Sequence, residues 1–202
     1  MGELDAYEVV GSEQKFKGKL LGLRVDDVRM VDGTVAQREI VTHPGAVAIV
    51  ALDEDGKIVL VNQYRPAVRA QLDELPAGLL DVDGESALDA AKRELAEEAH
   101  LIAADWNVLV DIHASPGSST EAVRVYLARE LSASEDEYQG EHEESTMTVS
   151  REPLPDAVRR ALTGGISSAP SVAGILAAVH GRATGWRDLR PADAPWSARP
   201  GR

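Results

Sequence analysis

Residues 78–101 read GLLDVDGESALDAAKRELAEEAHL, and their pattern is typical of a loop followed by a helix. Ser86 is suited to the N-cap position, and Asp89 follows three residues later as a weak form of the capping box. Apolar side chains then recur at helical spacing, at Leu88, Ala91, Leu95 and Ala99. Such spacing places them on one face that packs on a core. We expect a helix from Ser86 to about Ala99.

Three glutamates share one side of this expected helix. Glu94 and Glu98 are one turn apart and Glu97 lies between them, so their carboxylates project together, turned partly away from the core. Like charges at this spacing repel by roughly a few tenths of a kcal/mol per pair. A hard divalent ion such as Mg²⁺, held by carboxylate oxygens, offsets that repulsion. The commoner explanation of a glutamate cluster is a solvated helix face, and the carboxylates alone do not displace it.

Composition sets the class of protein. The chain has 202 residues, 44% hydrophobic and 27% charged, with a net charge of −13, which fits a globular protein of one substantial or two small domains. The acidic balance disfavours nucleic acid and anionic membranes as partners. There is no cysteine, which excludes disulfides and thiolate chemistry. No apolar run reaches membrane-spanning length, and the acidic N-terminus lacks the features of a signal peptide, so we expect a cytoplasmic location.

Strand patterns flank the expected helix on both sides. Residues 1–42 read as a β-meander that is too small to bury a core alone and must pack on the remainder or on a second subunit. Further strands are expected at residues 46–52, 57–64, 106–112 and 123–127, and helices at 155–162 and 170–180. Residues 191–202 are rich in Pro, Arg and Ala and read as a disordered tail. This order predicts an α+β fold with a mixed central sheet.

The spacing of residues 78–101 resembles the signature of the Nudix hydrolases, which cleave nucleoside diphosphates linked to another group. Gly78 is followed after six residues by Glu85, and after seven more by Arg93-Glu94-Leu95-Ala96-Glu97-Glu98. Two departures are visible, because the family has five residues in the first gap and Gly where His100 stands. The resemblance implies an α/β/α sandwich, with the catalytic domain at 43–190.

Motifs outside the signature resemble the ADP-ribose pyrophosphatase branch of that family. They are Gln63-Tyr64-Arg65-Pro66, Glu74-Leu75-Pro76-Ala77-Gly78-Leu79-Leu80-Asp81, Ser115-Pro116-Gly117 and the Glu143-Glu144 loop. In that branch an extra N-terminal antiparallel sheet builds a domain-swapped homodimer. The resemblance therefore implies that residues 1–42 form the dimer interface. The resemblance implies hydrolysis of ADP-ribose to AMP and ribose 5-phosphate, with Mg²⁺ as cofactor and Mn²⁺ as a substitute.

The resemblance also assigns roles to residues of the signature. Glu94 and Glu98 would be the main metal ligands, Glu97 a further ligand or bridge, and the Ala77 carbonyl an additional ligand. The alternative for Ala77 is a plain turn residue. Arg93 would pair with Glu85 and hold the loop, including Gly78, against the helix.

The base that takes a proton from the attacking water is expected outside the signature. By resemblance it is a loop glutamate, for which Glu144 is the nearest match and Glu143 the second. A solvated charge run is the competing interpretation of this loop. Glu97 and Arg93 complete the expected catalytic set.

Substrate contacts are expected from two further regions. Arg65 is the candidate for bidentate contact with a phosphate, with a surface ion pair as its alternative. Glu74, Gly117 and Glu121 match substrate-facing positions by resemblance. Asp73 stands where relatives carry Trp and Ser118 where they carry Phe, so the substrate stays open. Another nucleoside diphosphate sugar, a dinucleotide, or a non-catalytic role as a nucleotide-sugar sensor are the alternatives.

Overall fold

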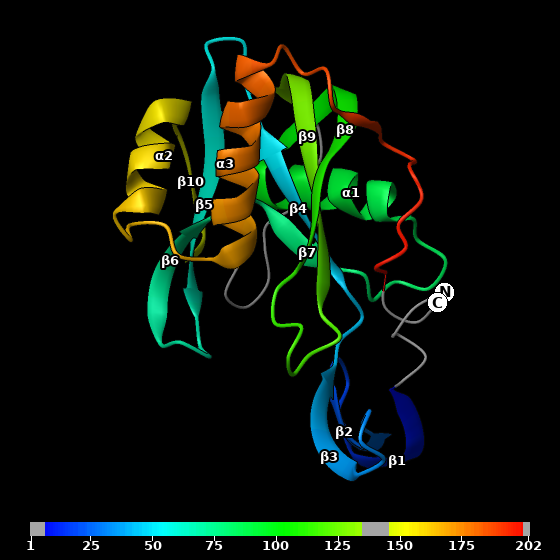
Figure 1. Ribbon diagram of the computed structural model, residues 1–202. Coiled ribbons are helices and arrows are strands. Elements are labelled where there is room, and N and C mark those ends of the chain that lie inside the picture. The colour runs from blue at the N-terminus through cyan, green and yellow to red at the C-terminus, as the bar shows by residue number, and fades with distance from the viewer. Residues whose placement is uncertain (1–6, 135–145, 200–202) are drawn as a thin grey trace.

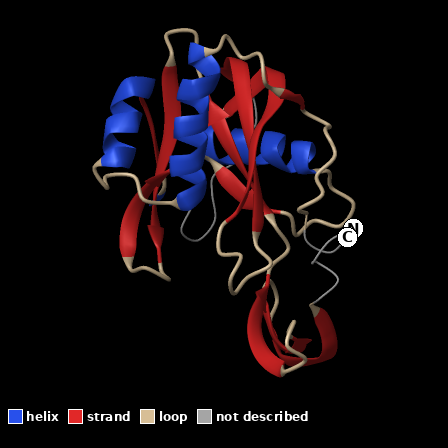
Figure 2. Ribbon diagram, in the orientation of Figure 1, coloured by secondary structure: helices blue, strands red, loops and turns tan. Residues whose placement is uncertain are grey.

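The computed structural model describes residues 7–134 and 146–199, and it confirms the expected sandwich. A mixed five-stranded sheet has the order β11-β8-β9-β4-β7, and a three-stranded sheet β10-β5-β6 lies beside it. Helix α1 covers one face and α2 and α3 the other (Figures 1 and 2). The elements of these layers are β4 (Ala46–Ala51), β5 (Lys57–Arg65), β6 (Ala70–Glu74), β7 (Ala77–Leu79), α1 (Ala87–Ala99), β8 (Leu101–His113), β9 (Ala122–Ala133), β10 (Thr148–Pro153), α2 (Leu154–Leu162), α3 (Ala169–Ala183) and β11 (Arg190–Pro191).

The central strand β4 explains why both faces of the sheet are covered. Ala48 and Val50 pack into the core beneath α2 and α3, whereas Val47 and Ile49 pack into the core beneath α1. Successive side chains of a strand point to opposite faces, so a continuous apolar run requires a partner layer on each side. β4 pairs parallel with β9 and antiparallel with β7, which makes the sheet mixed.

Strands β8 and β9 are longer than expected from sequence. They pair antiparallel from Leu101 opposite Ala133 to His113 opposite Ala122. Their ends carry polar residues such as Asp105 and Arg129, which form an ion pair at 2.6 Å. Polar residues interrupt the apolar pattern from which a strand is predicted, so the ends of these strands were not expected. An antiparallel pair with one solvated face nevertheless accommodates polar side chains.

A separate antiparallel sheet is formed at the N-terminus by β1 (Glu8–Lys17), β2 (Gly22–Arg29) and β3 (Val35–Thr42). It extends away from the sandwich (Figure 1). It is tied to the sandwich where the Val41 N–H donates to the Ser118 carbonyl at 2.8 Å and the Val41 carbonyl accepts from the Thr120 N–H at 3.0 Å. Several of its large apolar side chains are exposed, among them Tyr7, Val9, Phe16, Leu21 and Val35.

The C-terminal segment differs from the expectation of a disordered tail that begins at residue 191. Residues 191–199 lie on the sandwich, with Trp196 buried against the guanidinium of Arg124, whose central carbon is 4.9 Å from the ring centroid. Arg124 also donates to the Ala194 carbonyl at 2.6 Å. Burial of an indole and a cation–π contact offset the entropy of ordering a segment that composition alone assigns to a tail.

No helix among the described residues combines the length and apolar character that a bilayer crossing requires.

Candidate active site

Helix α1 begins and ends as its sequence predicts. The Ser86 hydroxyl accepts a hydrogen bond from the Asp89 N–H at 3.1 Å, which caps the first turn. His100 follows the helix with φ 54° and ψ 40°, in the left-handed conformation. Its N–H donates to the Ala96 carbonyl at 3.1 Å. His100 thus ends the helix in the conformation that glycine adopts most readily.

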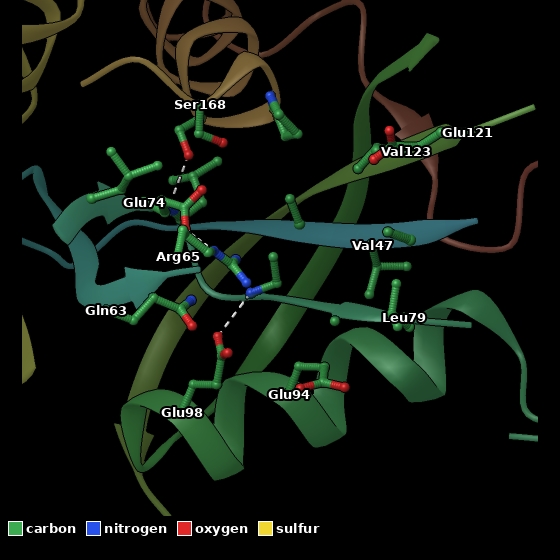
Figure 3. A pocket seen from close by; sticks show the side chains of 18 of the residues that line it. Val47, Gln63, Arg65, Glu74, Leu79, Glu94, Glu98, Glu121, Val123 and Ser168 are labelled. Carbon is green, nitrogen blue, oxygen red and sulfur yellow. Dashed lines mark hydrogen bonds and ion pairs between the residues drawn. The ribbon is translucent and has the colours of Figure 1, made fainter. Parts of the chain in front are cut away.

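The carboxylates of α1 correct one expectation. Glu94 and Glu98 are buried rather than turned away from the core, and only Glu97 is partly exposed. Strand β7 crosses above the helix, so Glu94 and Glu98 lie partly beneath this strand and also line the pocket described below. The Ala77 N–H donates to Glu98 at 2.8 Å (Figure 3), which fixes that carboxylate under β7.

Gly78 allows this close approach of strand and helix. A Cβ atom at Gly78 would lie 2.0 Å from the carboxyl group of Glu94. No side chain fits there without displacing that carboxylate. The glycine that opens the signature therefore has a steric function: it lets the backbone of β7 pass directly over Glu94.

Arg93 pairs with Glu85 as expected. Its Nε donates to one Glu85 oxygen at 2.9 Å and Nη2 to the other at 3.1 Å, a bidentate ion pair that ties the loop to the helix. Nη1 donates to Glu94 at 2.7 Å and to Glu97 at 3.1 Å. The hydrogen bonds to Glu85 and the charge of Glu94 raise the pKa of Arg93 despite the opposing effect of burial.

Strands β5 and β6 form the opposite wall. The Arg65 Nε donates to the buried carboxylate of Glu74 at 2.6 Å. Arg65 and Glu74 lie side by side above the helix in Figure 3. The ion pair that was the alternative for Arg65 is thus present, and it lies in the wall of the pocket rather than on an outer surface.

The third wall comes from the segment before β4 and the loop before β9. His43 and Glu121 both line the pocket. The His43 Nδ1 accepts from the Gly45 N–H at 3.0 Å. Burial lowers the pKa of His43, and the nearby Glu121 carboxylate partly opposes that effect. Gly117, expected to face the substrate, is not among the residues that line this pocket.

These walls enclose a cavity of about 1010 Å³, large enough for a nucleotide-sized ligand. It brings together most of the expected residues: Arg65, Glu74, Ala77, Gly78, Arg93, Glu94, Glu97, Glu98 and Glu121. Glu85 lies outside the lining and acts through Arg93. Glu143 and Glu144 fall outside the described residues. No role was predicted from the sequence for His43 or Gln63; the usable signal for Gln63 was its place in the motif Gln63-Tyr64-Arg65-Pro66, two residues before Arg65.

The residues suit a divalent cation in the kind of donor that they offer. Glu94, Glu97 and Glu98 offer carboxylate oxygens on one wall, and Glu85 adds a fourth acidic group against a single Arg93, so formal negative charge remains in excess. In the part of the chain that is described, Arg93 bonds three of these four groups, Glu85, Glu94 and Glu97, and no three acidic or histidine side chains converge as a formed metal cluster. The donor set is of the kind that binds a hard divalent cation, with Arg93 as the competing cation.

The comparisons with known proteins agree with this fold and identify the family. The NUDIX domain model matches residues 42–165. The chain is 47% identical over 203 aligned residues to the ADP-ribose pyrophosphatase of Mycobacterium tuberculosis, covering 99% of this chain and 95% of that protein. It is 40% identical to the methanol dehydrogenase activator of Bacillus methanolicus, covering 67% of this chain and 72% of that protein. The chain belongs to the Nudix family.

A solved structure supports the architecture independently. It is described as an ADP compounds hydrolase and superposes with a TM-score of 0.77, covering 92% of this chain and all of that chain at 21% identity. At that identity the likeness concerns the fold.

Proposed function

We propose that this chain hydrolyses the diphosphate linkage of ADP-ribose to give AMP and ribose 5-phosphate, and that it requires Mg²⁺. The observation that carries the proposal is the wall of α1 and β7, where Glu94, Glu97 and Glu98 face the pocket under Gly78. The substrate comes from the 47% identity, over nearly the full length of both chains, to a protein named ADP-ribose pyrophosphatase.

The chemistry needs neutralisation of the diphosphate, an oriented water and a proton acceptor. A bound divalent ion supplies positive charge to the phosphate oxygens and lowers the pKa of a bound water. In this proposal Glu94 and Glu98 hold the ion, with Glu97 and the Ala77 carbonyl as further ligands. Arg93, fixed by Glu85, keeps the carboxylates in place. Arg65 contacts a phosphate from the opposite wall.

The proton acceptor is assigned to Glu144, with Glu143 second, on the sequence resemblance alone. Glu144→Gln and Glu143→Gln separate the two, because removal of the base flattens the acid limb of the pH profile of kcat while metal affinity is retained. A flattened limb in neither variant would remove this loop from the mechanism.

The central test is a substrate panel with metal titration. Purified protein with Mg²⁺ is expected to release AMP from ADP-ribose with a higher kcat/KM than from other nucleoside diphosphate sugars or dinucleotides. Glu98→Gln is expected to lower kcat/KM by about two to three orders of magnitude while the protein stays folded by circular dichroism. Glu54→Gln, on an exposed turn, is the matched control. Normal turnover by Glu98→Gln would remove Glu98 from the metal site.

The same panel decides between the alternatives. A higher kcat/KM for another nucleotide sugar or a dinucleotide would keep the chemistry and change the substrate. Tight binding of ADP-ribose without turnover in Mg²⁺ or Mn²⁺ would indicate a sensor. A cytoplasmic location belongs to the same proposal, and cell fractionation tests it.

A homodimer through the N-terminal sheet is a separate part of the proposal. Its support is the exposure of Val9 and Phe16 in β1 and of Val35 in β3, in a three-stranded sheet that has no covering layer among the described residues. Phe16→Asp is expected to shift the protein from dimer to monomer in light scattering at micromolar concentration. A wild-type protein that is already a monomer there would refute the dimer.

A further inference from the structure

Gln63 is the residue of the pocket wall whose hydrogen bonding is incomplete. It lies in β5, is only 5% exposed and lines the pocket. Its side-chain Nε2 is buried and has no hydrogen-bond partner among the described residues. Buried polar groups are nearly always paired, because an unmade hydrogen bond costs stability. An unpaired amide in a ligand-sized cavity therefore indicates a donor that is satisfied by a ligand.

The strand geometry explains why this amide faces the pocket. Gln63 and Arg65 are two residues apart in β5, so their side chains share one face of the strand. Gln63 lies opposite Leu72 in β6, which also lines the pocket. Asn62 faces the other way and donates to Asp73 at 2.8 Å. Figure 3 shows the Gln63 amide directed toward the pocket, between Arg65 and Glu98.

The charged groups around Gln63 indicate which kind of ligand atom its amide would bind. Both arginines of the lining are engaged by carboxylates: Arg65 by Glu74, and Arg93 by Glu85, Glu94 and Glu97. Gln63 adds a neutral donor beside them. An N–H donor that is neutral and already desolvated suits an anionic oxygen, to which hydrogen bonds are stronger than to neutral acceptors.

We propose that Gln63 is a substrate-binding residue whose side-chain N–H donates a hydrogen bond to a non-bridging phosphate oxygen of the bound diphosphate. The proposal rests on the proposed function for the class of ligand. It extends that function by adding to Arg65 and the metal site a third, uncharged contact to the diphosphate.

The test separates binding from turnover. The probe is the α,β-methylene analogue of ADP-ribose, in which a carbon replaces the bridging oxygen, and its Kd is measured by calorimetry with Mg²⁺ present. Gln63→Met keeps the side-chain length without a donor, and we expect its Kd to rise about 10- to 100-fold. Gln63→Glu removes the donor and adds repulsion, so its loss is expected to be at least as large. Gln71→Met, on the exposed side of β6, is the matched control and keeps the wild-type Kd.

Thermal unfolding separates a substrate-binding role from a structural one, because the two roles predict opposite changes in the melting temperature of Gln63→Met. Because Gln63→Met removes a buried unpaired donor, we expect its melting temperature to equal or exceed that of the wild type. A melting temperature several degrees lower, together with weak binding, would assign Gln63 to support of the fold and overturn the proposal. An unchanged Kd in Gln63→Met, or in Gln63→Glu, would also overturn it.

Failure of the proposed function is distinguishable from failure of this inference. If the wild type binds the methylene analogue but does not hydrolyse ADP-ribose, the proposed hydrolysis fails while the expected pattern of Kd values still supports Gln63. If the wild type does not bind the analogue, both fail. If it hydrolyses ADP-ribose and Gln63→Met binds as tightly as the wild type, only the inference fails.

Discussion

The sandwich and the N-terminal sheet are both built from β-strands but differ in how far their apolar side chains are buried. In the sandwich, β4 and β5 carry side chains such as Ile49 and Leu60 that are 0% exposed, because helices cover both faces. In the N-terminal sheet, Phe16 is 61% exposed and Leu21 44% exposed. Hydrophobic stabilisation scales with the apolar area removed from water. The sandwich therefore holds the stability of the isolated chain, whereas the sheet is stabilised fully only by something that covers it.

Leu60→Ala tests the first half of this comparison and has the largest expected effect. Leu60 is fully buried beneath α2 and α3, so the truncation leaves a cavity and should lower the free energy of unfolding by about 2–5 kcal/mol. Urea denaturation measures it. In the monomeric Phe16→Asp background, Leu21→Ala makes the same change in the N-terminal sheet and is expected to cost less than about 0.5 kcal/mol. A comparable loss in that background would contradict the exposure of Leu21 in the single chain.

Gly78→Ala tests whether the site depends on close packing inside the sandwich. The added Cβ would meet the Glu94 carboxyl group at 2.0 Å and must displace it, so kcat/KM is expected to fall about 100-fold. Steady-state kinetics with Mg²⁺ measures the loss. At Gly165 an added Cβ finds its nearest neighbour at 3.5 Å, so Gly165→Ala is the control with unchanged turnover. Wild-type kinetics in Gly78→Ala would show that Glu94 can move without consequence.

Replacement of Asp111 has the smallest expected effect of the three, a change in stability that is limited to acidic pH. Burial raises its pKa, but hydrogen bonds from Arg124 and Arg190 outweigh this and hold the pKa below the ordinary value of 3.8. A depressed pKa in the folded state adds stability that is present above pH 3.8 and lost as the pH falls through the folded value. Asp111→Asn should therefore show a shallower loss of stability below that pH.

Acid titration of unfolding, followed by circular dichroism, measures the slope. Glu8 of the N-terminal sheet pairs with Arg29 in solvent, and exposed pairs contribute little. Glu8→Gln should therefore leave the acid slope unchanged. Equal slopes in Asp111→Asn and the wild type would contradict the role of Asp111.

Local patterns predicted the parts of the site that depend on neighbours in sequence. The cap at Ser86 and the apolar stripe follow from interactions within a few positions, and the structure confirms them. The family resemblance predicted the ion pair between Glu85 and Arg93, which is present. The Nudix resemblance is confirmed by the family comparison.

Features that depend on distant segments could not be predicted in this way. Glu94 and Glu98 are buried because β7 crosses α1, and no helical pattern reveals a crossing strand. Arg124 meets the Ala194 carbonyl across 70 positions, so composition alone assigned the segment to a tail. The partner of Arg65 is Glu74, which depends on the register of β5 and β6.

The contact between Gly78 and Glu94 also bears on how this enzyme can diversify. Every substitution at Gly78 introduces a Cβ that must displace the carboxyl group of Glu94, so changes at this position disturb the metal side of the pocket. The opposite wall, formed by the β5–β6 hairpin, carries no such restriction at Ala70 or Leu72, which line the pocket as ordinary side chains. Laboratory evolution of substrate range should therefore accumulate its changes on the hairpin, while the strand over the helix remains constant.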